Sequence, residues 1–158
     1  MHSTTTTTWS VRPVEPQDEA PWRALYRGYR TFYRLDHDDA VVDRTWQWIV
    51  RGDHGLFGLV ASRPDGTLGA LADLRWFARP SSATLGLYLD DLFTAAEHRG
   101  LGLGRMLLDR ARSVAADGGA SVVRWITAAD NATARSLYDA HATATPWITY
   151  DMAPGAAR

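Results

Sequence analysis

The spacing of hydrophobic positions changes along the chain and indicates where helices give way to strands. Residues 22–29 place apolar side chains three and four positions apart, as on one face of a helix. Residues 42–50 repeat that spacing and are followed by Gly52, a typical helix end. From residue 57 to 94 the apolar positions form short runs separated by turn residues, among them Arg-Pro-Asp-Gly at 63–66. That second pattern is typical of a β-meander.

The pattern predicts the element order β-α-α-β-β-β-α-β-α-β. We expect strands at 9–14, 57–62, 67–77, 83–94, 121–127 and 146–152, and helices at 22–33, 42–50, 103–115 and 130–140. This order predicts an α/β fold with a mixed, mostly antiparallel central sheet and flanking helices. Because neither a repeat nor a linker interrupts it, residues 9–153 are expected to form one domain behind a disordered tail, residues 1–8.

Composition agrees with one globular domain and excludes several kinds of site. The chain has 158 residues, of which 46% are hydrophobic and 22% charged. It has no cysteine, so disulfides, thiolate zinc sites and a cysteine nucleophile are excluded. The five histidines show no paired spacing, so we expect no metal. The Thr-rich start lacks the basic and apolar parts of a secretory signal, and no apolar run is long enough to span a bilayer, so the cytoplasm is the expected location.

Charge argues against a nucleic-acid-binding module. The net charge is −1, and the 17 basic residues, all arginine, form no stripe along one predicted element. Neither a nucleic-acid nor a membrane partner is therefore expected.

A glycine-rich turn joins the expected strand 83–94 to the helix that follows it. Glycines at such a turn let several backbone N–H groups and the positive end of a helix approach one phosphate. A Walker loop is excluded because the chain has no lysine. The dinucleotide fingerprint GxGxxG also fails, because its third glycine falls on Arg105 when counted from Gly100, and on Leu107 when counted from Gly102.

The turn does contain Arg-x-x-Gly-x-Gly, as Arg99, Gly102 and Gly104. This motif resembles the pyrophosphate-binding turn of the GNAT superfamily of N-acetyltransferases, which bind acetyl-CoA. The resemblance implies that the cofactor contacts Arg99, Gly100, Leu101, Gly102, Leu103, Gly104 and Arg105. The plainer alternative is a set of glycines that only turn the chain from strand to helix.

A second motif lies on the helix expected at 130–140. Asn131, Ala134 and Tyr138 fall within about 60° of one another around a helix. This stripe resembles the second GNAT motif, Asn-x-x-Ala-x-x-x-Tyr, which implies that Asn131 and Ala134 contact the cofactor and that Tyr138 lies near the thioester sulfur. The alternative is an amphipathic helix capped by Asp130 or Asn131 with a core tyrosine. Relatives often carry a glycine soon after the tyrosine, whereas residues 139–142 read Asp-Ala-His-Ala. The sequence therefore does not predict the residue at which this helix ends.

The strand before the glycines resembles that of the diamine (spermidine/spermine) acetyltransferase branch. Residues 86–94 read Gly-Leu-Tyr-Leu-Asp-Asp-Leu-Phe-Thr, close to the Tyr-Leu-Glu/Asp-Asp-Leu/Phe-Phe-Val of that branch. The resemblance implies that backbone groups of Leu92, Phe93 and Thr94 pair with the pantetheine arm and hold the thioester carbonyl. It also aligns Asp90 with an acidic residue implicated as the general base.

Acetyl transfer to an amine poses two proton problems. An alkylammonium with a pKa near 10.4 is almost fully protonated at pH 7, so a nearby carboxylate would help to remove its proton. Asp90 and Asp91 are adjacent on one strand and are expected to face opposite sides, with Asp90 as the base and Asp91 as a structural group. Tyr138 is the expected donor to the leaving thiolate. Without a cysteine for an acyl-enzyme, direct attack in a ternary complex is expected.

The sequence therefore predicts an N-acetyltransferase that uses acetyl-CoA, without a metal, on a small cationic amine. A silent coenzyme-A-binding domain and an acetyltransferase acting on protein amines are the alternatives. A homodimer is the expected assembly. A cationic acceptor could meet the acidic residues Asp36, Asp38, Asp39 and Asp90 and the aromatic residues Tyr29, Phe32 and Tyr33, which are also what a solvated loop and a packed helix would show.

Overall fold

The computed structural model describes residues 8–155 and divides the chain into two compact units, Met1–Ile126 and Thr127–Arg158. The predicted N-terminal tail falls almost entirely on residues 1–7, which lie outside the described part. Among the described residues, no helix is both long and apolar enough to cross a membrane.

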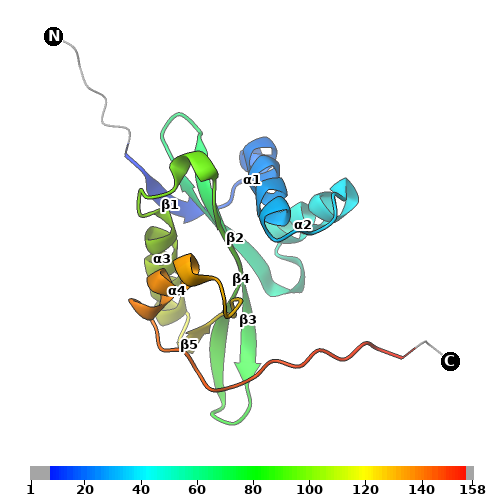
Figure 1. The fold of residues 1–158 in the computed structure, drawn as a ribbon, viewed down its shortest axis with the longest axis vertical. Coiled ribbons are helices and arrows are strands. Elements are labelled where there is room, and N and C mark those ends of the chain that lie inside the picture. The colour runs from blue at the N-terminus through cyan, green and yellow to red at the C-terminus, as the bar shows by residue number, and fades with distance from the viewer. Residues whose placement is uncertain (1–7, 156–158) are drawn as a thin grey trace. The chain divides into compact units, whose positions relative to one another are not determined.

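The first unit is built on a five-stranded sheet in the order β1-β2-β3-β4-β5 (Figure 1). The strands are β1 (Ser10–Pro13), β2 (Leu56–Ser62), β3 (Leu68–Arg79), β4 (Thr84–Thr94) and β5 (Ala120–Arg124). The first four pair antiparallel, and β5 runs parallel to β4. The predicted mixed, mostly antiparallel sheet with flanking helices is confirmed.

Two helices cover one face of this sheet, α1 (Glu19–Phe32) against β3 and β4, and α2 (Asp39–Arg51) against β2 (Figure 1). The helical spacing read from the sequence is confirmed, because Trp22, Leu25 and Tyr26 of α1 are buried. Helix α2 begins where the Asp38 carboxylate accepts the N–H of Ala40 at 2.9 Å, and it ends at the left-handed Gly52.

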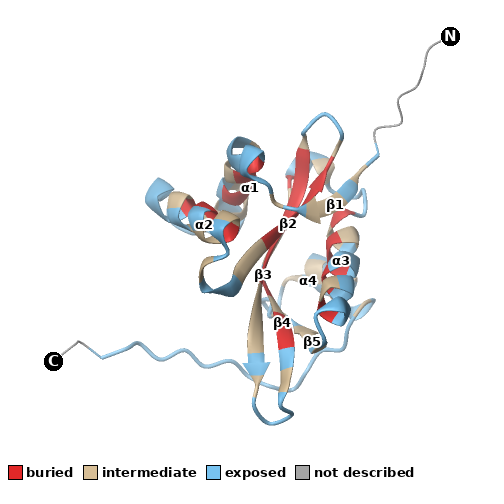
Figure 2. Ribbon diagram, turned by 180° about the vertical axis from the view of Figure 1, so that it is seen from behind, coloured by how far each residue is buried: buried red, intermediate tan, exposed pale blue. Residues whose placement is uncertain are grey.

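A third helix, α3 (Leu103–Asp117), covers the other face of the sheet and ends at Gly118, as the sequence predicts. Short 3₁₀ turns occupy Pro16–Asp18 (η1), Asp53–Gly55 (η2) and Ala96–His98 (η3). Buried residues occupy positions 58–62 of β2, 68–74 of β3, several positions along β4, and the helix faces that meet the sheet (Figure 2). Strand β4 thus packs against α1 on one face and α3 on the other, and the candidate site lies at its end.

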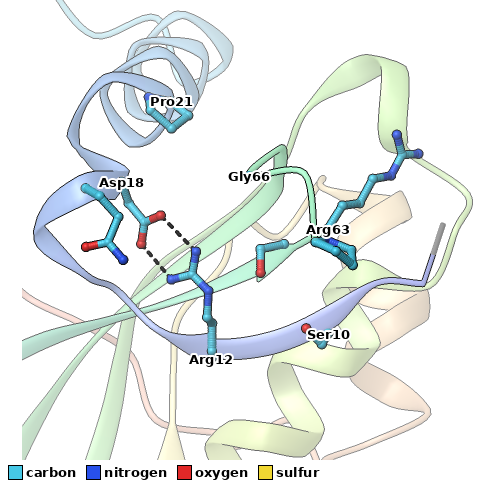
Figure 3. Close-up of a pocket in the computed structure, with 9 residues that line it drawn as sticks. Ser10, Arg12, Asp18, Pro21, Arg63 and Gly66 are labelled. Carbon is cyan, nitrogen blue, oxygen red and sulfur yellow. Dashed lines mark hydrogen bonds and ion pairs between the residues drawn. The ribbon is translucent and has the colours of Figure 1, made fainter.

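The connection from β1 to α1 is fixed by an ion pair. The Arg12 guanidinium donates to both Asp18 carboxylate oxygens, at 2.7 and 2.8 Å (Figure 3). The Glu15 N–H donates to the same carboxylate at 2.8 Å. Asp18 is 3% exposed. The shallow pocket drawn in Figure 3 is lined by β1, η1, the start of α1 and the β2–β3 turn, and it includes no predicted site residue.

Replacing Asp18 by Asn is expected to lower the free energy of unfolding at pH 7 by about 2 kcal/mol, because a buried charged hydrogen bond is lost. The Arg12 hydrogen bonds hold the pKa of Asp18 below its usual value, so this stabilisation is present at neutral pH and disappears as the pH falls through that lowered pKa. Urea unfolding between pH 3 and 7 measures it. Asp39→Asn, which breaks the exposed pair with Arg27, is the control and should cost under about 1 kcal/mol. Equal losses for the two variants would contradict this account of Asp18.

The second unit contains α4 (Ala132–Asp139), which confirms the helix predicted at 130–140. The last predicted strand, 146–152, is wrong, because this segment has no strand partner among the described residues. A strand is stable only where its backbone groups pair with a neighbour. The alternating apolar residues of the segment are exposed instead, with Trp147 at 84% and Tyr150 at 88%.

Candidate active site

The sheet splits between β4 and β5. The two strands pair from Leu85 opposite Ala120 to Tyr88 opposite Arg124, where β5 ends. Among the described strands, residues 89–94 of β4 pair only with β3, so the other edge of β4 carries backbone N–H and C=O groups without a strand partner there. The residues predicted to hold the pantetheine arm, Leu92, Phe93 and Thr94, all lie on this open edge. An extended ligand with amide groups could pair there as an additional strand does.

A β-bulge lies at the start of this open edge. Leu89 of β4 is opposite Leu74 of β3, but Asp91 is opposite Asp73, so Asp90 is an extra residue without a cross-strand partner. Such a bulge shifts the side-chain alternation of a strand by one position.

The bulge overturns the expectation that Asp90 and Asp91 face opposite sides of the sheet. Asp91 faces Asp73, and Asp90 contacts Arg75, which is two positions further along β3. Residues two apart on a strand share a face. Both aspartates therefore face the same side, where Tyr26 of α1 donates its hydroxyl to Asp91 at 3.4 Å.

Asp90 has a defined partner. The Arg75 Nε lies 2.9 Å from Oδ2 and 3.2 Å from Oδ1 of Asp90, and the Arg75 guanidinium also lies over the Tyr88 ring at 4.5 Å. Partial burial raises the pKa of the Asp90 carboxyl, and the Arg75 charge opposes that rise. The role of Asp90 as general base stays a prediction, now for a carboxylate that is ion-paired.

The glycine-rich turn leaves the start of α3 open. Gly100 and Gly102 have φ values of 78° and 79°, a conformation that favours glycine, and a Cβ on either would meet no atom within 4 Å. Gly102 is the N-cap of α3 and supplies no side-chain cap. Within residues 8–155 the first N–H groups of the helix therefore have neither an intrahelical partner nor a side-chain cap, and they carry the positive end of the helix dipole.

The side chains around this turn divide into anchors and exposed groups. Arg99 donates from Nε to the Thr94 carbonyl at 3.3 Å, and its guanidinium lies over Phe32 at 5.4 Å. Leu103 is 1% exposed, so its side chain belongs to the core. Arg105 is exposed, with Nε 3.8 Å from the Asp109 carboxylate. The main groups that this turn presents to a phosphate are therefore backbone N–H groups, and the positive charge of Arg99 is held beside them.

In the second unit, Asn131 is the N-cap of α4. Its Oδ1 accepts the Ala134 N–H at 3.3 Å, so this oxygen already has a structural role. Tyr138 is half-buried, and its carbonyl accepts the N–H groups of His141 at 2.9 Å and Ala142 at 2.8 Å. These bonds end the helix without the glycine that relatives often carry. Cofactor contacts of Asn131 and Ala134 stay predictions.

The acidic segment before α2 is mostly structural. Asp38 caps α2, and Asp39 pairs with Arg27 at 3.0 Å. Its carboxylates therefore give little support to an amine site there.

Two site candidates were missed by the sequence reasoning, Asp73 on β3 and the Tyr26 hydroxyl on α1. Asp73 is 1% exposed in the centre of the sheet. A signal for it was present, because Asp73 is the one polar residue in the apolar run 68–74. Its meaning depended on the β3–β4 register, which the sequence does not show.

The residues present fit acetyl-CoA. The open edge of β4 offers partners for the amide groups of an extended arm, and the uncapped start of α3 offers N–H groups for phosphate. Within residues 8–155, no group of three or more His, Asp or Glu side chains is arranged to hold a metal ion.

Comparisons with known proteins agree with this geometry. The acetyltransferase (GNAT) family model matches residues 22–142. A D-amino-acid N-acetyltransferase from Saccharomyces cerevisiae is 27% identical over 142 residues, covering 89% of this chain and 88% of that protein.

Solved structures share the fold at low identity. A ribosomal-protein-alanine N-acetyltransferase from Brucella melitensis biovar Abortus 2308 has a TM-score of 0.78 at 18% identity, covering 92% of this chain and 99% of that one. An aminoglycoside N-acetyltransferase in complex with coenzyme A has a TM-score of 0.79 at 16% identity, covering 93% and 95%. With the family model matching most of its length, the chain belongs to the acetyltransferase (GNAT) family and is an acetyl-CoA-dependent N-acetyltransferase.

Proposed function

We propose that the chain moves the acetyl group of acetyl-CoA to a small cationic primary amine by direct attack in a ternary complex. The observation that carries this proposal is the open edge of β4 at residues 89–94, followed at once by the uncapped start of α3. Together they offer one continuous set of backbone groups for the arm and the phosphates of the coenzyme.

Bound acetyl-CoA supplies the thioester carbonyl that the amine attacks. Backbone groups of Leu92, Phe93 and Thr94 orient the arm, and the N–H groups at 103–105 hold phosphate. Carboxylates on the α1 side of β4 accept the proton of the amine. Tyr138 donates a hydrogen bond to the departing sulfur, because a phenol of pKa about 10 and a thiol of pKa about 8.5 differ by only about 2 kcal/mol in proton affinity.

The choice of a small cationic acceptor rests on the charges beside the open edge. Asp90 and Asp91 lie on one face with Tyr26, and carboxylate oxygens suit an ammonium group because they accept hydrogen bonds from its N–H bonds. The relative that acts on D-amino acids and the similar structure named for aminoglycosides both concern small amines. Membership of the diamine branch is part of the same proposal, and a protein amine is the second candidate.

Purified protein is expected to release free coenzyme A thiol from acetyl-CoA with at least one small amine. The amines to test are diamines, polyamines, D- and L-amino acids and aminoglycosides. Mass spectrometry should find the product heavier by one acetyl group. The parent protein without amine and each amine without protein are the controls. If only a peptide amine is acetylated, the acceptor is a protein amine and the proposed acceptor class is wrong. If acetyl-CoA binds but no amine is acetylated, the chain is a silent binding domain.

A further inference from the structure

Asp73 is a buried carboxyl that the fold does not explain. Its side chain lies in the centre of β3, between the sheet and α1, and is 1% exposed. Neither carboxyl oxygen accepts a hydrogen bond from an N–H or O–H donor of residues 8–155. A buried polar group without such a donor destabilises the folded protein, so its presence calls for a functional reason.

The group that faces Asp73 is a second carboxyl. Asp91 is its cross-strand partner, so the two side chains are neighbours on one face of the sheet. Two ionised carboxylates both accept and neither donates, so a hydrogen bond between them requires one proton on the pair. Asp91 itself is half-buried and has the Tyr26 hydroxyl at 3.4 Å.

The surroundings of this carboxyl pair contain little that would hold two negative charges permanently. The charged and titratable groups that face the pair are Tyr26, Tyr29, Tyr33 and Arg30 from α1, Asp90 from β4, and Arg75 from β3, which is ion-paired with Asp90, while β2 places Gly58 opposite Asp73. Arg30 already donates to the Asp36 carbonyl at 2.7 Å, and Asp90 adds negative charge. Burial, and then the Asp91 charge, raises the pKa of Asp73 well above its usual range.

We propose that Asp73 and Asp91 act as one proton-accepting pair, in which Asp91 takes the proton of the acceptor ammonium and Asp73 then shares it. The inference rests on the proposed function and names the base within that site. Asp91 is the catalytic residue, because it is the member that a substrate can reach. Asp73 is a positioning residue that acts through it.

The proton transfer balances without another reactant. In the ammonium an N–H bond breaks and its electron pair stays on nitrogen, which becomes the nucleophile. An O–H bond forms on Asp91, and the pair goes from doubly to singly ionised, so it acts as a base only above the raised pKa of Asp73. Two carboxylates that repel each other bind this proton more tightly than one carboxylate does, which brings the base closer to an amine in proton affinity. The proton passes to solvent after the amide product leaves.

The first test is the pH dependence of kcat/KM for one good acceptor. Asp73→Asn keeps the shape of the side chain but removes the repulsion, so the acid limb should move to lower pH by about one unit or more, with a rate about ten-fold lower on the plateau. Asp18→Asn is the control for a buried aspartate outside the site, and its acid limb should follow that of the parent. The proposal is overturned if the acid limb of the Asp73→Asn profile stays where it is in the parent. It is also overturned if the acid limb moves only in Asp90→Asn.

A second test needs neither acetyl-CoA nor an acceptor, so it separates this inference from the proposed function. Carbon-13 NMR of labelled aspartate carboxyls should show one carboxyl that titrates far above the others and whose signal is missing in Asp73→Asn. Asp91→Asn should shift the titration of that same carboxyl to lower pH. If every aspartate carboxyl titrates in the ordinary range near pH 4, no shared proton exists and the inference is wrong.

Stability supplies a third measurement on the same variants. Because the raised pKa favours the protonated form in the folded state, the free energy of unfolding of the parent falls as pH rises from about 4 toward that raised pKa. Asp73→Asn lacks this loss, so its stability relative to the parent should increase with pH, opposite to Asp18→Asn. A stability difference that does not change with pH would contradict a protonated Asp73. If Asp73→Asn fails to fold, the titration of Asp91→Asn decides between the outcomes.

Discussion

Replacing Gly102 by Asp is expected to weaken acetyl-CoA binding by about a hundred-fold, on the order of 3 kcal/mol. Gly102 has a φ of 79° and open space around a new Cβ, and aspartate is among the residues that tolerate this conformation. A carboxylate at the N-cap also favours the helix itself. The fold should therefore persist while the new charge repels the coenzyme phosphates at the start of α3.

Calorimetry and thermal melting measure this change. At about 100 times Kd, acetyl-CoA should stabilise the parent by about 2.7 kcal/mol, and Gly102→Asp should show almost none of that shift. Gly119→Asp is a matched control, because Gly119 has a φ of 74°, equally open space and a place at the far end of α3. Its new charge lies roughly 25 Å away, beyond the screening length. Equal losses in both variants would remove α3 from the cofactor site.

Replacing Tyr138 by Phe is expected to lower kcat by about ten-fold or more, with Kd for acetyl-CoA changed by less than about two-fold. A hydrogen bond to the departing sulfur strengthens only as negative charge develops there, so its loss affects the transition state and hardly affects the bound cofactor. Thiol release under saturating conditions gives kcat, and calorimetry gives Kd.

Tyr150→Phe is the matched control for this prediction. Tyr150 lies in the same unit and is 88% exposed, so loss of its hydroxyl should change neither kcat nor Kd. If Tyr138→Phe turns over like the parent, the Tyr138 hydroxyl is not the donor. If it loses affinity and rate together, the hydroxyl contributes to cofactor binding instead.

The parts of the fold that repeat a local pattern could be predicted from the sequence. Helices α1 and α2 follow from apolar spacing, and the ends of α2 and α3 follow from Gly52 and Gly118. The glycine-rich turn was predictable because its chemistry needs neighbouring backbone groups, and these are fixed by a few consecutive residues.

The parts that depend on pairing between distant residues could not be predicted. The bulge at Asp90 is defined only by the register of β3 with β4. Because of it, Asp91 lies on the same side of the sheet as Asp90, whereas simple alternation would place it on the other side. The meaning of Asp73 depends on the same register. At residues 146–152 the sequence instead predicted a feature that is absent: the alternating pattern indicated a strand, but the described residues provide no partner for it.

Hydrogen–deuterium exchange with and without acetyl-CoA tests most directly whether the open edge of β4 and the start of α3 hold the cofactor. We expect slower exchange of amides in residues 89–94 and 100–105, and unchanged exchange in the segments around the pocket of Figure 3, residues 10–21 and 62–66. Protection around that pocket, with residues 89–105 unaffected at saturating acetyl-CoA, would contradict the proposed site.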